Sequence, residues 1–301
     1  MLTGATGFVG RHTLTALTAA GHEVHAVARQ RGADVAGVSW HEVDLLAGCD
    51  VVSDVEPEIL IHLAWYAEHG KFWSSVENVR WVEASLALLR AFTAAGGRRV
   101  VMAGSCAEYE WSRELYPEDA PLRPATLYGA AKCGLQTVAS AFSEQAGIEL
   151  AWGRLFFLYG PFEDARRFVP SLVLALLGNE PARMTEGSQR RDFLHTADAG
   201  AAFAMLADSD LAGAINVASG TALALRELAG RIARLLDAEE LLQIGALRMP
   251  DGEPPALVAD VGRLRDEVGF TPGIALEDGL AGVIGWWRSR LASGPTGDPR
   301  A

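Results

Sequence analysis

The chain has 301 residues, of which 50% are hydrophobic and 21% are charged, a composition typical of a globular protein with a sizeable core. Its net charge of -12 argues against binding to nucleic acid or to an anionic membrane, because both would repel such a surface. The apolar stretches are too short to span a bilayer, no targeting segment is visible, and three scattered cysteines give neither a metal nor a disulfide spacing, so we expect a cytoplasmic protein without a metal site.

Short apolar segments alternate with helical segments through the first half of the chain. Apolar side chains recur at helical spacing in the longer segments. Strands are predicted at residues 23–28, 59–64, 99–103 and 149–157, and helices at residues 10–20, 79–95 and 126–145. This alternation is typical of an α/β fold, a Rossmann-type doubly wound parallel sheet with helices on both faces. Only three residues precede the first glycine, so we expect a shortened first strand.

The alternation loosens after Pro161, where we expect a smaller C-terminal α/β substrate lobe. Helices are predicted at residues 168–177, 225–236 and 276–291, a strand at 214–218, and a loop at 249–255. We therefore predict a dinucleotide-binding domain at residues 1–160, which also takes in about 190–220, and a substrate lobe at residues 161–301. Residues 293–301 contain two prolines and two glycines and are predicted to be a flexible tail.

The chain opens with a glycine-rich loop that leads into the first predicted helix. Such glycines allow a tight turn and let backbone N–H groups approach a pyrophosphate at a helix N-terminus. An ordinary turn between strand and helix is the alternative, but a buried strand follows at the distance that a dinucleotide fold requires. The residues of this loop that we expect to contact a cofactor are Gly4, Thr6, Gly7, Phe8, Val9 and Gly10.

The residue after the second predicted strand bears on the choice of cofactor. NAD enzymes usually place a carboxylate there to accept from the ribose 2′-hydroxyl. Here Arg29 follows Ala28, and its guanidinium can bind a 2′-phosphate by charge-assisted hydrogen bonds. NADP is therefore favoured, with NAD possible, and a solvated arginine is the alternative.

Tyr128 and Lys132 are spaced by four residues in a predicted helix, so their side chains lie on one helix face. A nearby ammonium favours tyrosinate, so we expect Lys132 to lower the pKa of Tyr128 toward the range useful for proton transfer. Ser105 follows the strand at 99–103 and is placed to polarise the same substrate oxygen. A surface helix pair is the alternative interpretation.

Together these features resemble the extended short-chain dehydrogenase/reductase family, which contains nucleotide-sugar epimerases, dehydratases and 4-ketoreductases. The resemblance covers nearly the whole chain. Its landmarks are the glycine loop, Asp44-Leu45, His62-Leu63-Ala64, Asn78, Ser105, Tyr128 with Lys132, Arg154-Leu155-Phe156, Tyr159-Gly160-Pro161, Arg191-Asp192-Phe193-Leu194-His195 with Asp198, and Asn216-Val217-Ala218. Phe157 departs from the family, because epimerases often carry an asparagine there that touches the nucleotide.

The resemblance implies roles for individual residues. The implied catalytic residues are Ser105, Tyr128 and Lys132. The implied cofactor contacts are Asp44, Leu45, Leu63, Ala64, Tyr128 and Lys132, in addition to Arg29 and the glycine loop. For a nucleotide-diphosphate sugar, the implied contacts are Ser105, Cys106 and Arg191, with Arg248 as a weaker candidate; a structural ion pair of Arg191 with Asp192 or Asp198 is the alternative. The helices at 79–95 and 126–145 pair in relatives, so a homodimer is expected.

Three reactions of the family compete. Dehydratases carry an Asp-Glu pair directly after the catalytic hydroxyl residue, whereas Cys106 and Ala107 stand there in this chain, with Glu108 one place further on. Dehydration is therefore disfavoured. Arg29 favours an NADPH-dependent 4-ketoreductase that makes a 6-deoxysugar nucleotide, and an NAD-dependent 4-epimerase is the alternative. A non-catalytic NADP-binding protein is less favoured, because it has no need of an intact catalytic set.

Aromatic residues follow the strand at 59–64. Trp65, Tyr66, His69 and Trp73 either shape a sugar pocket, since aromatic faces stack on sugar C–H surfaces, or anchor a loop. His62 is expected to be a packed residue beneath the cofactor.

Overall fold

A computed structural model describes residues 1–293. Its main element is a seven-stranded sheet in which every neighbouring pair of strands is parallel. In spatial order the strands are β11 (Gly213–Val217), β7 (Glu149–Leu155), β5 (Arg99–Ser105), β4 (Ile59–His62), β1 (Leu2–Thr3), β2 (Val24–Ala28) and β3 (Val38–Glu42). The expected doubly wound α/β sheet is confirmed.

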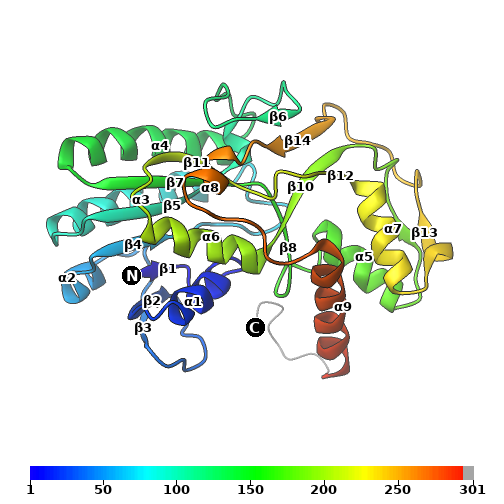
Figure 1. Ribbon diagram of the computed structural model, residues 1–301, viewed down its shortest axis with the longest axis horizontal. Coiled ribbons are helices and arrows are strands. Elements are labelled where there is room, and N and C mark those ends of the chain that lie inside the picture. Colours follow the sequence, from blue (N-terminus) through cyan, green and yellow to red (C-terminus); the bar gives the residue numbers. More distant parts are fainter. Residues whose placement is uncertain (294–301) are drawn as a thin grey trace.

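Helices cover both faces of this sheet (Figure 1). On one face α1 (Gly10–Ala19) packs against α6 (Thr196–Asp208), and their apolar side chains join those of the strands in one core. On the other face, a second core is formed with α2 (Val51–Val55), α3 (Glu77–Ala94) and α4 (Leu127–Ala146). Strands buried on both faces are near-continuous apolar runs, as in residues 99–103.

A smaller lobe lies at the right of Figure 1. Its core is formed by α5 (Phe168–Leu177), α7 (Leu225–Leu235) and α9 (Leu276–Ala292). A second sheet joins this lobe to the first, with the order β12 (Ala222–Ala224), β10 (Arg190–His195), β14 (Ala256–Ala259) and β6 (Leu115–Tyr116). Strand β8 (Phe157–Tyr159) pairs with β10 beside that path, and β9 (Ala182–Arg183) pairs with β13 (Leu242–Gln243).

Strand β1 is short, as expected. It pairs through Leu2 with Ala26 on one side and Ile61 on the other, so both neighbouring strands continue beyond its amino end. A cavity of about 340 Å³ lies there, lined by residues that include Val24, His25 and Ile59. The amino group of Met1 donates to the carbonyl of Ile59 at 2.7 Å, and burial lowers its pKa to about 6.

Several elements differ from the sequence prediction. The strand expected at 149–157 is two strands, β7 and β8, which belong to different sheets. Helix α6 and strands β3 and β10 were not predicted. Apart from Ser293, the predicted flexible tail lies outside the described residues, and the predicted domain boundaries stay a prediction. In the described part of the chain, every helix is too short or too polar to cross a membrane.

Candidate active site

The predicted site residues gather where the strand order reverses. Strands β2 and β4 flank β1, and all three end at the same edge of the sheet because they are parallel. Open α/β sheets bind ligands at such a switch point, outside the carboxyl ends of the strands. Gly4 follows β1 at this edge, Leu63 follows β4, and Ser105 is the last residue of β5.

The glycine loop requires the absence of side chains. Gly4 has φ +71°, and a Cβ there would lie 2.8 Å from the backbone nitrogen of Ala64. A Cβ on Gly10, the first residue of α1, would lie 2.0 Å from the carbonyl oxygen of Gly4. The N–H of Gly7 donates to that same carbonyl at 2.9 Å. The loop is therefore a compact backbone cradle at a helix N-terminus, which fits the pyrophosphate of a dinucleotide.

The other residues of this loop differ in exposure. Phe8 and Val9 are half-buried and pack against the core under the sheet, which fixes the loop from below. Thr6 is half-buried and accepts at its carbonyl from the Arg11 guanidinium at 2.8 Å, while Gly7 is exposed. Ala64 lies against Gly4, so the structure brings these predicted cofactor contacts together.

Three more predicted cofactor contacts lie past the ends of β2 and β3. Arg29 follows β2 directly and is exposed, and its side chain has no hydrogen bond or ion pair within residues 1–293. Asp44 is exposed and accepts from the N–H of Leu46 at 3.1 Å, while Leu45 is buried in the core. Arg29 is therefore a cation without a partner at this edge, and the exposed carboxylate of Glu42, at the end of β3, also has no partner within residues 1–293.

Ser105, Tyr128 and Lys132 come from β5 and α4. The Ser105 hydroxyl accepts from the N–H of Ala107 at 3.2 Å and caps the short helix η1 (Cys106–Glu108). Tyr128 lies in the first turn of α4 and is half-buried, and Thr126 caps that helix by accepting from the N–H of Gly129. Lys132 follows one turn later and is buried.

Lys132 is held by groups other than Tyr128. Its Nζ donates to the carbonyl of Ala103 at 2.8 Å and lies 3.6 Å from the ring centroid of Trp65. The indole N–H of Trp65 donates to the Asn78 amide oxygen at 2.9 Å, which fixes the ring. Burial lowers the pKa of Lys132 to about 7, against a raising effect of the Glu108 charge.

The expectation that Lys132 lowers the pKa of Tyr128 is wrong for this structure. Burial raises the pKa of Tyr128 to about 12, and the effects that oppose burial come from a hydrogen bond with Ser105 and from the charge of Arg167. The phenol is therefore neutral near pH 7 and carries a proton that it can donate. Its ring meets Phe72 edge-on at a centroid distance of 5.0 Å.

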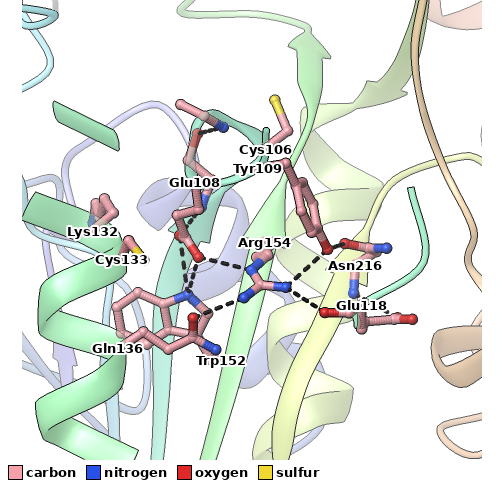
Figure 2. Close-up of polar contacts among 12 residues, drawn as sticks. Cys106, Glu108, Tyr109, Glu118, Lys132, Cys133, Gln136, Trp152, Arg154 and Asn216 are labelled. Atoms are coloured by element: carbon pink, nitrogen blue, oxygen red, sulfur yellow. Dashed lines mark hydrogen bonds and ion pairs between the residues drawn. The ribbon is translucent and has the colours of Figure 1, made fainter. Parts of the chain in front are cut away.

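The Glu108 carboxylate points toward Arg154 and the Trp152 indole (Figure 2). This carboxylate accepts from Arg154 Nε at 2.8 Å and from the N–H of Ser105 at 2.7 Å, and both of its oxygens accept from the Trp152 indole N–H at 3.1 Å. Arg154 also donates to the Tyr109 hydroxyl at 2.9 Å and is itself buried. The one carboxylate that follows Ser105 closely is thus bound within a buried ion pair.

His62 is packed, as expected. Its two ring nitrogens lie 2.7 Å from the hydroxyl of Thr3 and 2.8 Å from that of Ser85, and burial lowers its pKa to about 3.

Arg191 lies close to Cys106, the residue after Ser105. Its charge lowers the pKa of the buried Cys106 thiol, which burial raises to about 12. The guanidinium donates to the carbonyl of Pro254 at 3.0 Å and forms an ion pair with Glu253. The alternative partners are occupied elsewhere, because Asp192 and Asp198 accept from backbone N–H groups. Arg191 is thus buried beside the residue that follows Ser105.

Arg248 is not brought into this group by any contact of the described residues. Its side chain is 85% exposed and pairs at 3.1 Å with Asp251, whose side chain is 90% exposed. The loop at 249–255 instead supplies Glu253 and Pro254, which hold Arg191.

Sequence reasoning missed two titratable residues near the site, Glu163 and Arg167. Glu163 is 3% exposed, its Oε2 has no hydrogen-bond partner within residues 1–293, and burial raises its pKa to about 8. The charge of Arg167 opposes this increase and also acts on Tyr128. Both residues follow the Tyr159-Gly160-Pro161 landmark closely, and this position in the sequence could have marked them as candidate site residues.

A model of the NAD dependent epimerase/dehydratase family matches residues 1–218. UDP-glucuronic acid decarboxylase 1 of Xenopus tropicalis is 24% identical over 311 residues, covering 97% of this chain and 72% of that protein. The dTDP-glucose 4,6-dehydratase of Streptomyces niveus is 28% identical over 194 residues, covering 63% of this chain and 55% of that protein.

Two solved structures are similar over nearly the full length. MoeE5 in complex with UDP-glucuronic acid and NAD is 29% identical, with a TM-score of 0.84, and the match covers 96% of this chain and 99% of that one. TunA, described as an NAD dependent NDP-hexosamine 5,6-dehydratase involved in tunicamycin biosynthesis, is 28% identical, with a TM-score of 0.82 and coverage of 96% and 97%.

Proposed function

Because the chain belongs to the NAD-dependent epimerase/dehydratase family, we propose that it is an NADPH-dependent 4-ketoreductase that reduces the keto group of a nucleotide-linked 4-keto-6-deoxysugar. The observation that carries this proposal is the pairing of a neutral Tyr128 with a Glu108 that is withdrawn into an ion pair. The first supplies a proton donor, and the second leaves the segment directly after Ser105 without the acid and base that water elimination needs.

The chain's own residues account for the proton transfer. The Tyr128 phenol, with its pKa raised to about 12, donates its proton to the sugar O4 as the carbonyl is reduced. Ser105 orients that oxygen, since its hydroxyl lies at the end of β5 beside the phenol. A bound dinucleotide supplies the hydride. Lys132 would hold the ribose next to the nicotinamide. Its Nζ would then release the carbonyl of Ala103, to which it donates in this structure.

The cofactor assignment rests on two features. The cradle of Gly4, Gly7 and Gly10 fits the pyrophosphate of either dinucleotide. The exposed, unpaired Arg29 favours NADPH, because only NADPH carries a 2′-phosphate that this guanidinium can bind. Asp44 and Leu45 lie next to the adenine in this proposal, with Leu63 and Ala64 beneath the cofactor.

Arg191 is the proposed diphosphate contact, beside Cys106. A buried guanidinium whose ion-pair partner is the half-buried Glu253 can exchange that carboxylate for a phosphate of similar geometry. Arg248 is not kept in this proposal, since its side chain is exposed and pairs with Asp251.

The three unpaired cysteines suit a reducing compartment, and we place the protein in the cytoplasm.

An NAD-dependent 4-epimerase is the second candidate. The observation that favours it is that MoeE5, which is similar over nearly its whole length, holds NAD together with UDP-glucuronic acid. An epimerase would use the same Tyr128 in both directions and would release no reduced cofactor.

The test is the reduction of UDP- and dTDP-4-keto-6-deoxyglucose, measured as the loss of NADPH absorbance. We expect turnover with one of the two nucleotides, and Tyr128→Phe should lower it about a hundredfold or more while leaving NADPH binding intact. Wild-type turnover in that variant would refute the mechanism. Interconversion of a UDP-hexose with its C4 epimer without added cofactor would support the second candidate instead.

A further inference from the structure

An exposed tryptophan lies directly beside the catalytic phenol. The Trp73 side chain belongs to the loop after β4, and 40% of the residue's surface is exposed. The N–H of Tyr128 donates to the carbonyl of Trp73 at 3.1 Å, and the two rings meet edge-on at 5.7 Å and 89°. The buried Phe72 packs on Trp73 at 4.4 Å, which holds the indole in place. Backbone and ring contacts thus fix Trp73 relative to the proton donor.

A second tryptophan reaches the same place from another loop. Trp111 follows η1 and meets Trp73 edge-on, at 6.5 Å and 89°. Its indole N–H donates to the carbonyl of Cys106 at 3.0 Å. Because that donor is already used, Trp111 offers a ligand only the apolar surface of its ring. Trp73, Trp111 and Cys106 together are called the tryptophan wall below.

The chemistry of the tryptophan wall is apolar apart from the indole N–H of Trp73, which has no acceptor within residues 1–293. The Cys106 thiol is buried and neutral near pH 7, and the remaining surface is indole. Aromatic rings stack on the C–H face of a sugar and give their largest gain to apolar substituents. A methyl group against this wall gives up no hydrogen bonds to water. A hydroxyl group does give them up, and a carboxylate loses a larger hydration free energy.

We propose that the tryptophan wall is the sugar subsite and that it selects a hexose with a methyl group at C5 over one with a hydroxymethyl or a carboxylate. The proposal rests on the proposed function, because Tyr128 must face the sugar C4. An apolar pocket discriminates against an added hydroxyl by about ten- to a hundredfold. Arg167 is the competing determinant, since its charge also reaches Tyr128 and would favour a carboxylate.

The experiment measures dissociation constants on protein saturated with NADPH, so that no oxidised cofactor is present to oxidise the 4-hydroxy probes. The probes are UDP, UDP-6-deoxyglucose, UDP-glucose and UDP-glucuronic acid, with the dTDP series used if dTDP binds more tightly than UDP. We expect the 6-deoxy probe to bind wild type about tenfold or more tightly than the other two sugars. Tighter binding of the glucuronate would overturn the proposal in favour of Arg167.

Three variants locate the effect. Trp73→Ala should weaken the 6-deoxy probe about tenfold or more and leave UDP unchanged, and Trp73→Phe should restore part of the loss. Val76→Ala is the matched control, because Val76 lies in the same loop, is 72% exposed and has no ring to stack. If each probe binds Trp73→Ala as tightly as it binds wild type, the proposal that the tryptophan wall is the sugar subsite is refuted. If no 4-keto substrate is reduced but the 6-deoxy probe still binds most tightly, the proposed reaction is refuted and the proposed sugar subsite stands.

Discussion

Arg29 is the residue on which the choice between the two dinucleotides depends. Its exposed side chain follows β2, and no partner within residues 1–293 competes for it. Neighbouring Arg31 differs, because it forms an ion pair with Asp34. The two arginines therefore provide a test and its control within three positions of the chain.

Arg29→Ala should weaken NADPH about ten- to a hundredfold and NADH little, since a hydrogen bond to a charged group contributes about 1.5–3 kcal/mol. Titration of both reduced cofactors against the variant and wild type measures this difference. Arg31→Ala should change neither affinity by more than about twofold. A wild type that already prefers NADH would show that the NADP assignment is wrong and would favour the epimerase.

The positions of the candidate site residues in the fold were more predictable than their contacts. The spacing of Tyr128 and Lys132 follows from helix geometry alone, and the glycine loop from backbone sterics. The pKa of Tyr128 was predicted in the wrong direction, because the ammonium of Lys132 is taken up by Trp65 and Ala103, which are distant in sequence. Burial beside Phe72 then dominates. Such competition between partners is visible only in three dimensions.

At the scale of elements, the ion pair between Glu108 and Arg154 joins η1 to strand β7. Arg154 donates to Glu108, to Tyr109, to the carbonyl of Glu118 at 2.8 Å and to Gln136 at 2.8 Å (Figure 2). One guanidinium thus fixes the segment after Ser105 against the sheet and against α4.

Arg154→Met should lower the free energy of unfolding by about 3–5 kcal/mol, because it leaves the Glu108 carboxylate buried without its cation. Urea unfolding measures the loss. Arg123→Met is the control: its pair with Glu110 is largely exposed at the arginine, and its removal should cost less than about 1 kcal/mol. Similar losses in both variants would mean that the buried pair has no special role in holding η1.

The predicted elements are those with a clear periodicity. Residues 10–20, 79–95 and 126–145 are helical within a few positions of the prediction. Helix α6 was not predicted, because most of its surface is buried against α1 and the sheet. It is therefore rich in alanine and lacks an amphipathic pattern. Strand β10 escaped because it begins with charged residues, whose partners Glu253 and Ser219 are supplied by distant loops.

At the scale of the whole molecule, helices α3 and α4 lie side by side on one face of the sheet (Figure 1). Each has an exposed valine, with Val79 47% and Val138 50% exposed. We keep the proposal that these helices pair with those of a second copy to form a homodimer.

Light scattering at micromolar concentration should give the mass of a dimer for wild type and of a monomer for Val138→Glu, because a buried unpaired charge opposes the interface. Met205→Glu is the matched control, since Met205 is 37% exposed on the opposite face, in α6. A monomeric wild type would contradict the proposal, and so would dimer loss in the control alone.

The short first strand also has a consequence for protein engineering. The amino group of Met1 lies at the mouth of a slot whose two walls are the edges of β2 and β4. The last residue of any tag or fusion peptide placed ahead of Met1 must lie within that slot. A leader of three or four valine or isoleucine residues has the shape to add backbone pairs on both sides, whereas a leader with proline lacks the N–H groups for them. The choice of cloning linker is therefore a choice about the centre of the sheet.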